Sequence, residues 1–195
     1  MSESHAPGAM RVAEARTSET DPIRVAWLQA DLRGRIGVTF APGKSTTHLS
    51  ADPWDRDLDT DLEQLAGAHG VRLLVPLIED HELLTLRIPR LQRRAEHFGM
   101  AVARLPIADG GVPQQAAARP LVDLAVSVAR AGYNVCFHCR GGLGRAGTLA
   151  ACTLVRLGMD AQAAMAQVRA VRPGAIENTE QERFVQHFAA AVGAS

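Results

Sequence analysis

A cysteine and an arginine five residues apart enclose a glycine-rich segment. Residues 138–145 read His-Cys-Arg-Gly-Gly-Leu-Gly-Arg. Glycines let a backbone curl until successive N–H groups converge on one point, and this geometry binds anions. The planar guanidinium of an arginine adds a two-pronged grip on phosphate oxygens. The segment therefore predicts a phosphate loop, with catalytic Cys139 and Arg145 at its ends and substrate-binding Arg140, Gly141, Gly142, Leu143 and Gly144 between them.

The runs on either side of this loop are apolar and predict the elements that position it. Residues 133–137 are typical of a buried strand, and residues 148–157 of a buried helix. A helix N-terminus presents unpaired N–H groups and the positive end of its dipole. Such surroundings favour the thiolate form of a cysteine, so Cys139 is predicted to be a nucleophile beneath a bound phosphoryl group. A glycine-rich turn beside a core cysteine explains the pattern less well, because all the parts fall in register.

A thiolate that attacks phosphorus expels an oxygen that needs a proton, so a carboxylic acid must stand opposite the nucleophile. Asp109 is the best candidate, in the string Pro-Ile-Ala-Asp-Gly-Gly-Val-Pro over residues 106–113. It follows a predicted strand, and the two glycines after it allow the loop to move. An ordinary Asp-Gly turn is the alternative reading of this string.

His138-Cys139-x5-Arg145 resembles the signature of the cysteine-dependent protein tyrosine and dual-specificity phosphatases, and the string around Asp109 is similar to the kinase-associated phosphatase branch. The resemblance implies a protein tyrosine phosphatase-like fold and hydrolysis of phosphomonoesters through a phosphocysteine, with no cofactor and no metal. It implies a phosphorylated protein as substrate, carrying phosphotyrosine or also phosphoserine and phosphothreonine. A kinase-complex partner is left open.

The resemblance also assigns supporting roles and exposes two departures. His138 is expected to orient the loop, and Gln181 matches the second glutamine of a pattern that positions water in the family. Glu177 stands where the first glutamine is found. Ala146 replaces the Ser or Thr whose hydroxyl helps the cysteine leave, and Thr148 is a supporting candidate two residues further on.

Two rival functions remain open, and the departures at Ala146 and Glu177 bear on the second of them. One is a phosphatase of a phosphoinositide or a nucleotide, although lipid-type members tend to carry lysines inside the loop and this loop has none. The other is a catalytically impaired phosphate-binding module. A redox pair formed by Cys136 and Cys139 is disfavoured because Cys136 falls inside the predicted strand. The acidic residues and histidine at 79–82 are more typical of a solvated loop or helix cap than of a metal site.

The chain as a whole is neutral and of single-domain size. It has 195 residues, 21 basic and 21 acidic side chains, and three cysteines. This balance does not suggest a nucleic-acid-binding surface, and no apolar run is long enough for a membrane helix. Three cysteines do not make a disulfide framework, so a reducing, cytoplasmic setting is expected. Residues 1–20 are predicted to be a disordered tail and residues 21–195 the phosphatase domain.

Apolar runs that alternate with helical patterns predict an α/β fold, a single domain with a mainly parallel central sheet flanked by helices. In such sheets ligands bind beyond the C-terminal strand ends, where Cys139 is placed. Strands are expected at 23–28, 35–41, 71–78, 100–107 and 133–137. Helices are expected at 58–69, 89–98, 121–131, 148–157, 161–171 and 179–192.

Overall fold

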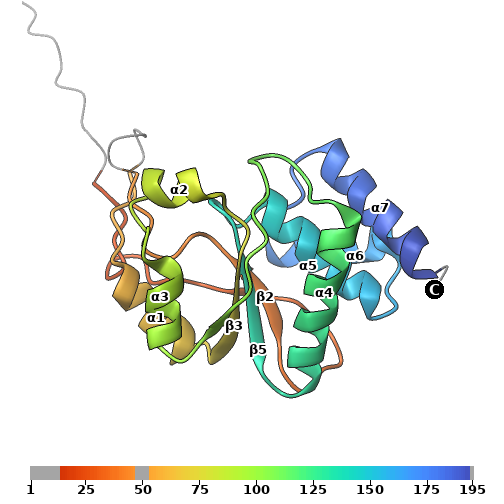
Figure 1. Cartoon of the computed structure of the whole chain (residues 1–195), viewed down its shortest axis with the longest axis horizontal. Helices are drawn as coiled ribbons and strands as arrows, with labels where there is room; N and C mark the ends of the chain where they lie inside the picture. Colours follow the sequence, from red (N-terminus) through yellow and green to blue (C-terminus); the bar gives the residue numbers. More distant parts are fainter. Residues whose placement is uncertain (1–13, 47–52, 194–195) are drawn as a thin grey trace, which may run out of the picture.

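The computed structural model describes residues 14–46 and 53–193 and shows a five-stranded sheet with helices on both faces (Figure 1). Across the sheet the strand order is β1-β2-β5-β3-β4, and all neighbours are parallel except β1 and β2. The prediction of a mainly parallel α/β domain is therefore confirmed. The strands are β1 (Ala26–Trp27), β2 (Ile36–Thr39), β3 (Val71–Pro76), β4 (Ala101–Val102) and β5 (Asn134–His138).

Helices cover the sheet in two unequal layers. Figure 1 shows α1 (Leu58–Ala66) and α3 (Leu91–His97) on one face, and α2 (Asp80–Thr85) near one end of the strands. The helices of the other layer lie on the opposite face in the same view. These are α4 (Gln115–Arg130), α5 (Gly144–Arg156), α6 (Ala161–Val171) and α7 (Thr179–Gly193).

Helix α5 is the centre of the larger layer. It packs on β2 and β5 and is enclosed by α4, α6 and α7, so every residue from Gly144 to Val155 is buried. Its small side chains allow this close packing from several sides. The helix begins four residues before the expected start at residue 148, because its first turn is the end of the glycine-rich loop. Arg145 is thereby fixed in a regular helical turn.

Strand β4 is shorter than the run of residues 100–107 indicates. Only Ala101 and Val102 form a ladder with β3, although alternate N–H groups further along still donate to β3 and the residue after it. Leu105 N–H, for example, donates to the Pro76 carbonyl at 3.2 Å. A proline has no N–H to return, so the ladder cannot be completed there.

Two helices depart from the sequence interpretation. Helix α2 was not expected, and it is closed at its start by reciprocal bonds between the side chains and backbones of Glu79 and Glu82. Helix α4 begins at Gln115, before Pro120, rather than after it. Proline removes one helical hydrogen bond, but burial of Leu121, Val122 and Ala125 on the apolar face outweighs that loss.

The packed part of the chain begins before residue 21. Ser18 is buried and exchanges hydrogen bonds with the backbone of Asp57, and Arg16 N–H donates to the Pro53 carbonyl. Residues 1–13 of the expected tail lie outside the described residues. Within the described residues, no helix is long and apolar enough to cross a membrane.

Candidate active site

The register of the sheet brings three loops to one edge. Thr39 and Pro76 are both paired with His138, so β2, β3 and β5 end level with one another. Cys139 follows directly and is only 3% exposed. It lies in a cavity of about 400 Å³. The other lining residues are Lys44, Thr46, Trp54, Asp109, Arg140, Gly141, Leu143 and Glu177.

The carbonyl groups of the loop are held by donors from neighbouring segments. Ala41 N–H donates to the Arg140 carbonyl at 3.3 Å. The guanidinium of Arg172 donates to the carbonyls of Gly141 and Gly142, at 2.7 and 3.1 Å. In a trans peptide the N–H points opposite to the C=O. Because the carbonyls are engaged outside the loop, the N–H groups are free to face an anion above Cys139.

Glycine is needed in the loop at one position above all. Gly142 has φ +69°, the left-handed region, and a side chain there would collide with the carbonyl of Thr39. The loop therefore packs directly against the end of β2. This close approach joins the phosphate loop to the strand that flanks β5.

Arg145 is buried and its terminal nitrogens are fully engaged. Nη1 contacts Glu82 Oε2 at 2.5 Å and the Ile107 carbonyl at 2.9 Å. Nη2 contacts Glu82 Oε1 at 2.9 Å and Asp109 Oδ1 at 2.8 Å. The structure therefore brings together two predicted site residues, Arg145 and Asp109, and adds Glu82 to them. Asp109 is the exposed partner of Nη2, so this contact is the one left for exchange with a phosphate.

The charges of this group reinforce one another. Burial opposes ionisation of Glu82, but hydrogen bonds from Arg145 and the Glu79 N–H outweigh it, and the pKa of Glu82 lies below its usual value. Burial likewise opposes the charge on Arg145, yet Glu82, Cys139 and Asp109 together raise the pKa of this arginine. Arg145 and Glu82 thus form a permanent ion pair behind the phosphate loop.

Asp109 lies at the start of an exposed turn that α7 holds in place. Its side chain is 63% exposed, and Gly110 follows with φ +75°. The Gly110 carbonyl accepts from Asn178 Nδ2 at 2.8 Å and from Gln181 Nε2 at 3.3 Å. Helix α7 therefore fixes the turn after Asp109, while the exposed carboxylate is held only by its ion pair with Arg145.

Gln181 and Glu177 occupy different environments. Gln181 is fully buried, its Oε1 accepts from the Glu177 N–H at 2.8 Å, and its Nε2 faces the backbone of Gly110 and Gly111. Glu177 lines the cavity beside Cys139. The pocket therefore presents a carboxylate, and the Gln181 amide is used in joining α7 to the turn after Asp109.

His138 lies in the interior rather than in the cavity. It is fully buried, and its Nδ1 lies 3.4 Å from the Cys139 carbonyl. Burial lowers the pKa of His138 to about 4, so the ring is neutral near pH 7. The contact to the Cys139 carbonyl is consistent with a role in orienting the start of the loop.

The hydroxyl of Thr148 is engaged within the helix. Its Oγ1 donates to the Gly144 carbonyl at 2.7 Å, one turn back along α5. Ala146 is buried and offers no hydroxyl. In this arrangement Thr148 stabilises the first turn of α5, where Arg145 resides.

Four residues at the site were not predicted from the sequence to be site residues: Glu82, Arg172, Lys44 and Trp54. Glu82 fell in a segment interpreted as a solvated loop or helix cap, and the cap is present. In the sequence, Glu82 is simply the second of two glutamates three residues apart. That spacing is only a weak signal that it is the buried partner of the distant Arg145. No cluster of metal-ligating side chains occurs among residues 14–46 and 53–193.

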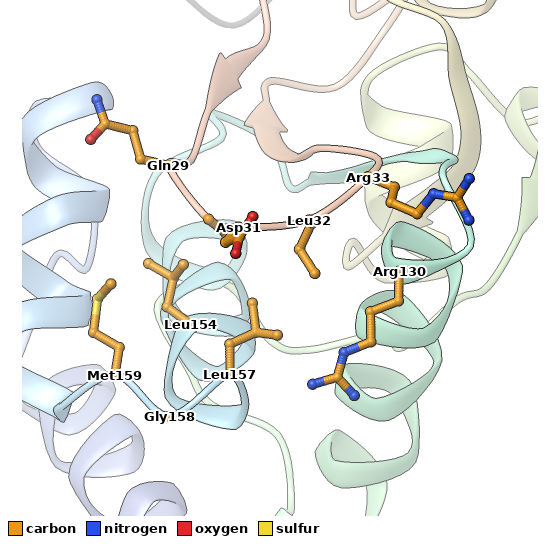
Figure 2. A pocket seen from close by; sticks show the side chains of 10 residues that line it. Gln29, Asp31, Leu32, Arg33, Arg130, Leu154, Leu157, Gly158 and Met159 are labelled. Carbon is orange, nitrogen blue, oxygen red and sulfur yellow. The ribbon is translucent and has the colours of Figure 1, made fainter.

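A larger cavity, of about 570 Å³, lies at the opposite end of α5 (Figure 2). Leu154 and Leu157 form part of its wall, and Arg33 and Arg130 lie at one side. The helix that separates it from the phosphate loop has 13 residues, or roughly 20 Å at 1.5 Å per residue. Its described lining holds no cysteine, serine or threonine, so its size alone does not make it the active site.

Comparison with known proteins agrees with this geometry. The family model described as "PTP-SAK: Swiss Army Knife protein, DSP-PTPase phosphatase domain" matches residues 55–185. Cyclin-dependent kinase inhibitor 3 of Rattus norvegicus is 26% identical over 181 residues, which cover 90% of this chain and 82% of that protein.

Solved structures show the same arrangement of elements. Kinase associated phosphatase (KAP), with its catalytic-site cysteine replaced by serine, matches with a TM-score of 0.80 and 25% identity, over 90% of this chain and 98% of that one. Tk-PTP in its active form matches with a TM-score of 0.68 and 26% identity, over 85% and 97% of the two chains. The likeness extends over nearly the whole of each solved chain.

Proposed function

The chain belongs to the DSP-PTPase phosphatase family, and from this premise we propose that it dephosphorylates proteins through Cys139, Arg145 and Asp109. The observation that carries the assignment is the environment of Arg145. This buried arginine is held by Glu82 next to the phosphate loop. The carbonyls of that loop accept hydrogen bonds from outside it, for example from Arg172. Cys139 at the base of that loop supplies the nucleophile. The phosphate loop and Arg145 together form a site for a tetrahedral dianion.

In the first step, phosphate takes the place of Asp109 at Nη2 of Arg145. The Cys139 thiolate attacks phosphorus, a sulfur–phosphorus bond forms, and the bond from phosphorus to the leaving oxygen breaks. Asp109 gives its proton to that oxygen, which departs as an alcohol or phenol.

In the second step, water attacks the phosphocysteine and the sulfur–phosphorus bond breaks. The thiolate and inorganic phosphate are the products, and the carboxylate left by the first step accepts the proton of the water. Ala146 gives no hydroxyl to stabilise the departing sulfur, and the Thr148 hydroxyl is bonded to Gly144. Loop N–H groups and the N-terminus of α5 therefore supply the stabilisation of this thiolate.

Replacing Cys139 by serine tests the nucleophile. We expect Cys139→Ser to abolish phosphate release from phosphotyrosine, phosphothreonine, phosphoinositide and nucleotide substrates, while it still binds phosphate. Cys152→Ala, in the buried part of α5, is the matched control and should retain turnover. Residual turnover of Cys139→Ser near the wild-type rate would contradict the assignment, and the substrate panel separates a protein phosphatase from the lipid and nucleotide alternatives.

Replacing Asp109 by asparagine tests the general acid. We expect Asp109→Asn to lower kcat for phenyl phosphate by roughly 10²–10⁴-fold, because the phenolate must then leave without a proton. The loss should be much smaller for an aryl phosphate with a strongly acidic leaving group. Asp123→Asn, whose partner is the surface residue Arg156, is the control. Equal losses for both substrates would exclude Asp109 as the proton donor.

A reducing compartment suits this chemistry. All three cysteines, Cys136, Cys139 and Cys152, are unpaired, and Cys139 must remain a thiolate to act. The cytoplasm is therefore the setting we propose. A kinase-bound phosphoprotein is one substrate to include, since a relative is named as an inhibitor of a cyclin-dependent kinase.

A further inference from the structure

The only lysine of the sequence lines the catalytic cavity. Lys44 follows the turn after β2, and the residue is 7% exposed. Its Nζ lies 4.0 Å from the centre of the Trp54 ring and 4.8 Å from that of Phe40. These aromatic faces stabilise an ammonium group without accepting a strong hydrogen bond from it.

Two of the cations near Lys44, Arg56 and Arg172, have polar partners of their own, whereas the Lys44 ammonium contacts aromatic rings. Arg56 is paired with buried Asp61, and Arg172 donates to the loop carbonyls. Within residues 14–46 and 53–193, no carboxylate forms an ion pair with the Lys44 ammonium. An ammonium that lines the pocket of Cys139 and has no carboxylate partner among the described residues is arranged for an anionic ligand.

We propose that the Lys44 ammonium binds the phosphate group of the substrate from the wall of the catalytic pocket, held there by the Trp54 ring. This inference rests on the proposed function, because the phosphate loop must place the phosphoryl group above Cys139. Lys44 then adds a point charge to the N–H groups of the loop and to the fixed guanidinium of Arg145. It is a substrate-binding residue outside the 138–145 segment.

Burial and the nearby charges also affect the protonation of this amine. The pKa of Lys44 is lowered to about 8, mainly by burial and then by repulsion from Arg56, Arg172 and Arg140. Attraction to Cys139 offsets a part of this lowering. Asp109 and Glu177 are the carboxylates of the same pocket. Carboxylates and guanidiniums keep their charges between pH 7 and 9.5, whereas the amine loses its proton in this range. Phosphate should therefore bind less tightly as pH rises through about 8.

Calorimetric titration of the full-length Cys139→Ser protein with inorganic phosphate is the direct test. Adding Lys44→Met should weaken phosphate binding by roughly ten- to a hundredfold at pH 7, the effect of one hydrogen bond to a charged group. Lys44→Arg should keep the affinity and abolish the loss between pH 7 and 9.5, because a guanidinium does not deprotonate there. Unchanged phosphate affinity in Lys44→Met would overturn the proposal.

The same variants distinguish phosphate binding by Lys44 from a purely structural role of this residue. If Lys44 only anchors the loop to Trp54, then Lys44→Met and Lys44→Arg should show the same pH profile of phosphate binding as the parent, and this result would also overturn the proposal. Failure of the proposed function would instead appear as turnover in Cys139→Ser, which the binding titration does not depend on.

The single lysine permits a second test on the wild-type protein. Lys44 is the single lysine of the sequence, so peptide mass spectrometry can follow its acetylation separately from that of the N-terminal amine. Inorganic phosphate should slow acetylation of Lys44 and leave that of the N-terminus unchanged. The control is sodium chloride at equal ionic strength. Equal labelling rates of Lys44 in phosphate and in chloride would contradict the contact.

Discussion

At the scale of single residues, the central feature of the site is the Arg145 guanidinium, whose N–H donors are divided among several partners. Glu82 takes one edge of the guanidinium and the Ile107 carbonyl takes a further N–H. Asp109 holds the remaining edge and is the only one of these partners that is exposed. In the mechanism that we propose, an incoming phosphate exchanges with Asp109, and the same exchange frees this carboxyl to protonate the leaving oxygen.

Glu82→Gln should weaken substrate binding and leave the nucleophile intact. Glutamine keeps the shape of the side chain but removes the charge that fixes Arg145, so the guanidinium loses its orientation toward phosphate. We expect kcat/KM to fall by roughly ten- to a hundredfold, the equivalent of one charge-assisted hydrogen bond, about 1.5–3 kcal/mol. Steady-state kinetics with an aryl phosphate measures this.

The control for Glu82→Gln is Glu63→Gln, an exposed position on α1. Circular dichroism must show that Glu82→Gln remains folded, because opening a buried ion pair also destabilises a protein. A folded Glu82→Gln with wild-type kcat/KM would show that Arg145 does not need this carboxylate.

At the scale of elements, the site is a junction between β5 and α5, and neighbouring segments set its shape. Thr39 at the end of β2 packs against the loop, and Arg172 just after α6 binds its carbonyls. Helix α7 holds the turn beyond Asp109 through Asn178 and Gln181. The site is therefore supported from three sides, and the shape of the phosphate loop does not depend on its own sequence alone.

Two adjacent glycines give a matched test of this packing. Gly142→Ala places a methyl group against the Thr39 carbonyl at a residue with φ +69°, so the loop must shift. We expect a stability loss of about 1–3 kcal/mol and a large loss of activity. Gly141→Ala meets nothing closer than the Leu143 side chain at 3.7 Å and should stay within about 0.5 kcal/mol of wild type.

Urea unfolding and turnover of the two variants measure the difference. The comparison is internal, because the glycines are consecutive and belong to the same loop. Similar stability and activity for Gly142→Ala and Gly141→Ala would mean that the contact with β2 does not shape the site.

At the scale of the whole molecule, charged side chains gather where the parallel strands end, whereas the protein interior disfavours a charged group. This edge of the sheet collects Cys139, Lys44 and Arg145 beside Asp109 and Glu177. One residue earlier, His138 lies wholly inside the core between β2 and β3. Its ring must stay neutral there, and this requirement couples the stability of the entire domain to pH.

His138 should make the protein less stable in acid. Burial lowers the pKa of His138 from its usual 6.5 to about 4, so between these values the unfolded chain binds a proton and the native protein does not. Stability contributed by the neutral ring is thus present above pH 6.5 and is lost as pH falls toward 4. The loss reaches about 2 kcal/mol by pH 5.

Urea unfolding of the wild type and of His138→Gln at pH 7 and pH 5 tests this linkage. The variant should lose less stability in acid than the wild type, by the amount attributed to the ring. His97→Gln, an exposed position at the end of α3, should behave as the wild type does. The expectation fails if His138→Gln and wild type lose equal stability between the two pH values.

The sequence by itself determined the parts of this protein that depend on neighbours in the chain. Glycines between Cys139 and Arg145, after one apolar run and before another, were enough to predict a phosphate loop between a strand and a helix. Alternating strand and helix patterns were enough for a mainly parallel sheet, and parallel strands place their C-terminal loops at one edge. These inferences hold because backbone conformation and side-chain periodicity are local properties.

Only the tertiary structure decided which distant side chains meet at that loop. Glu82 and Arg145 are 63 positions apart, and Arg172 reaches Gly141 across 31. In the sequence Glu82 belongs to a polar segment and Lys44 to a turn, and neither pattern indicates burial. The packing of α2 and of the loop after β2 buries most of both side chains, and a largely buried charge is stabilised by a partner. Glu82 has one in Arg145, and for Lys44 we propose that the partner is the phosphate of the substrate.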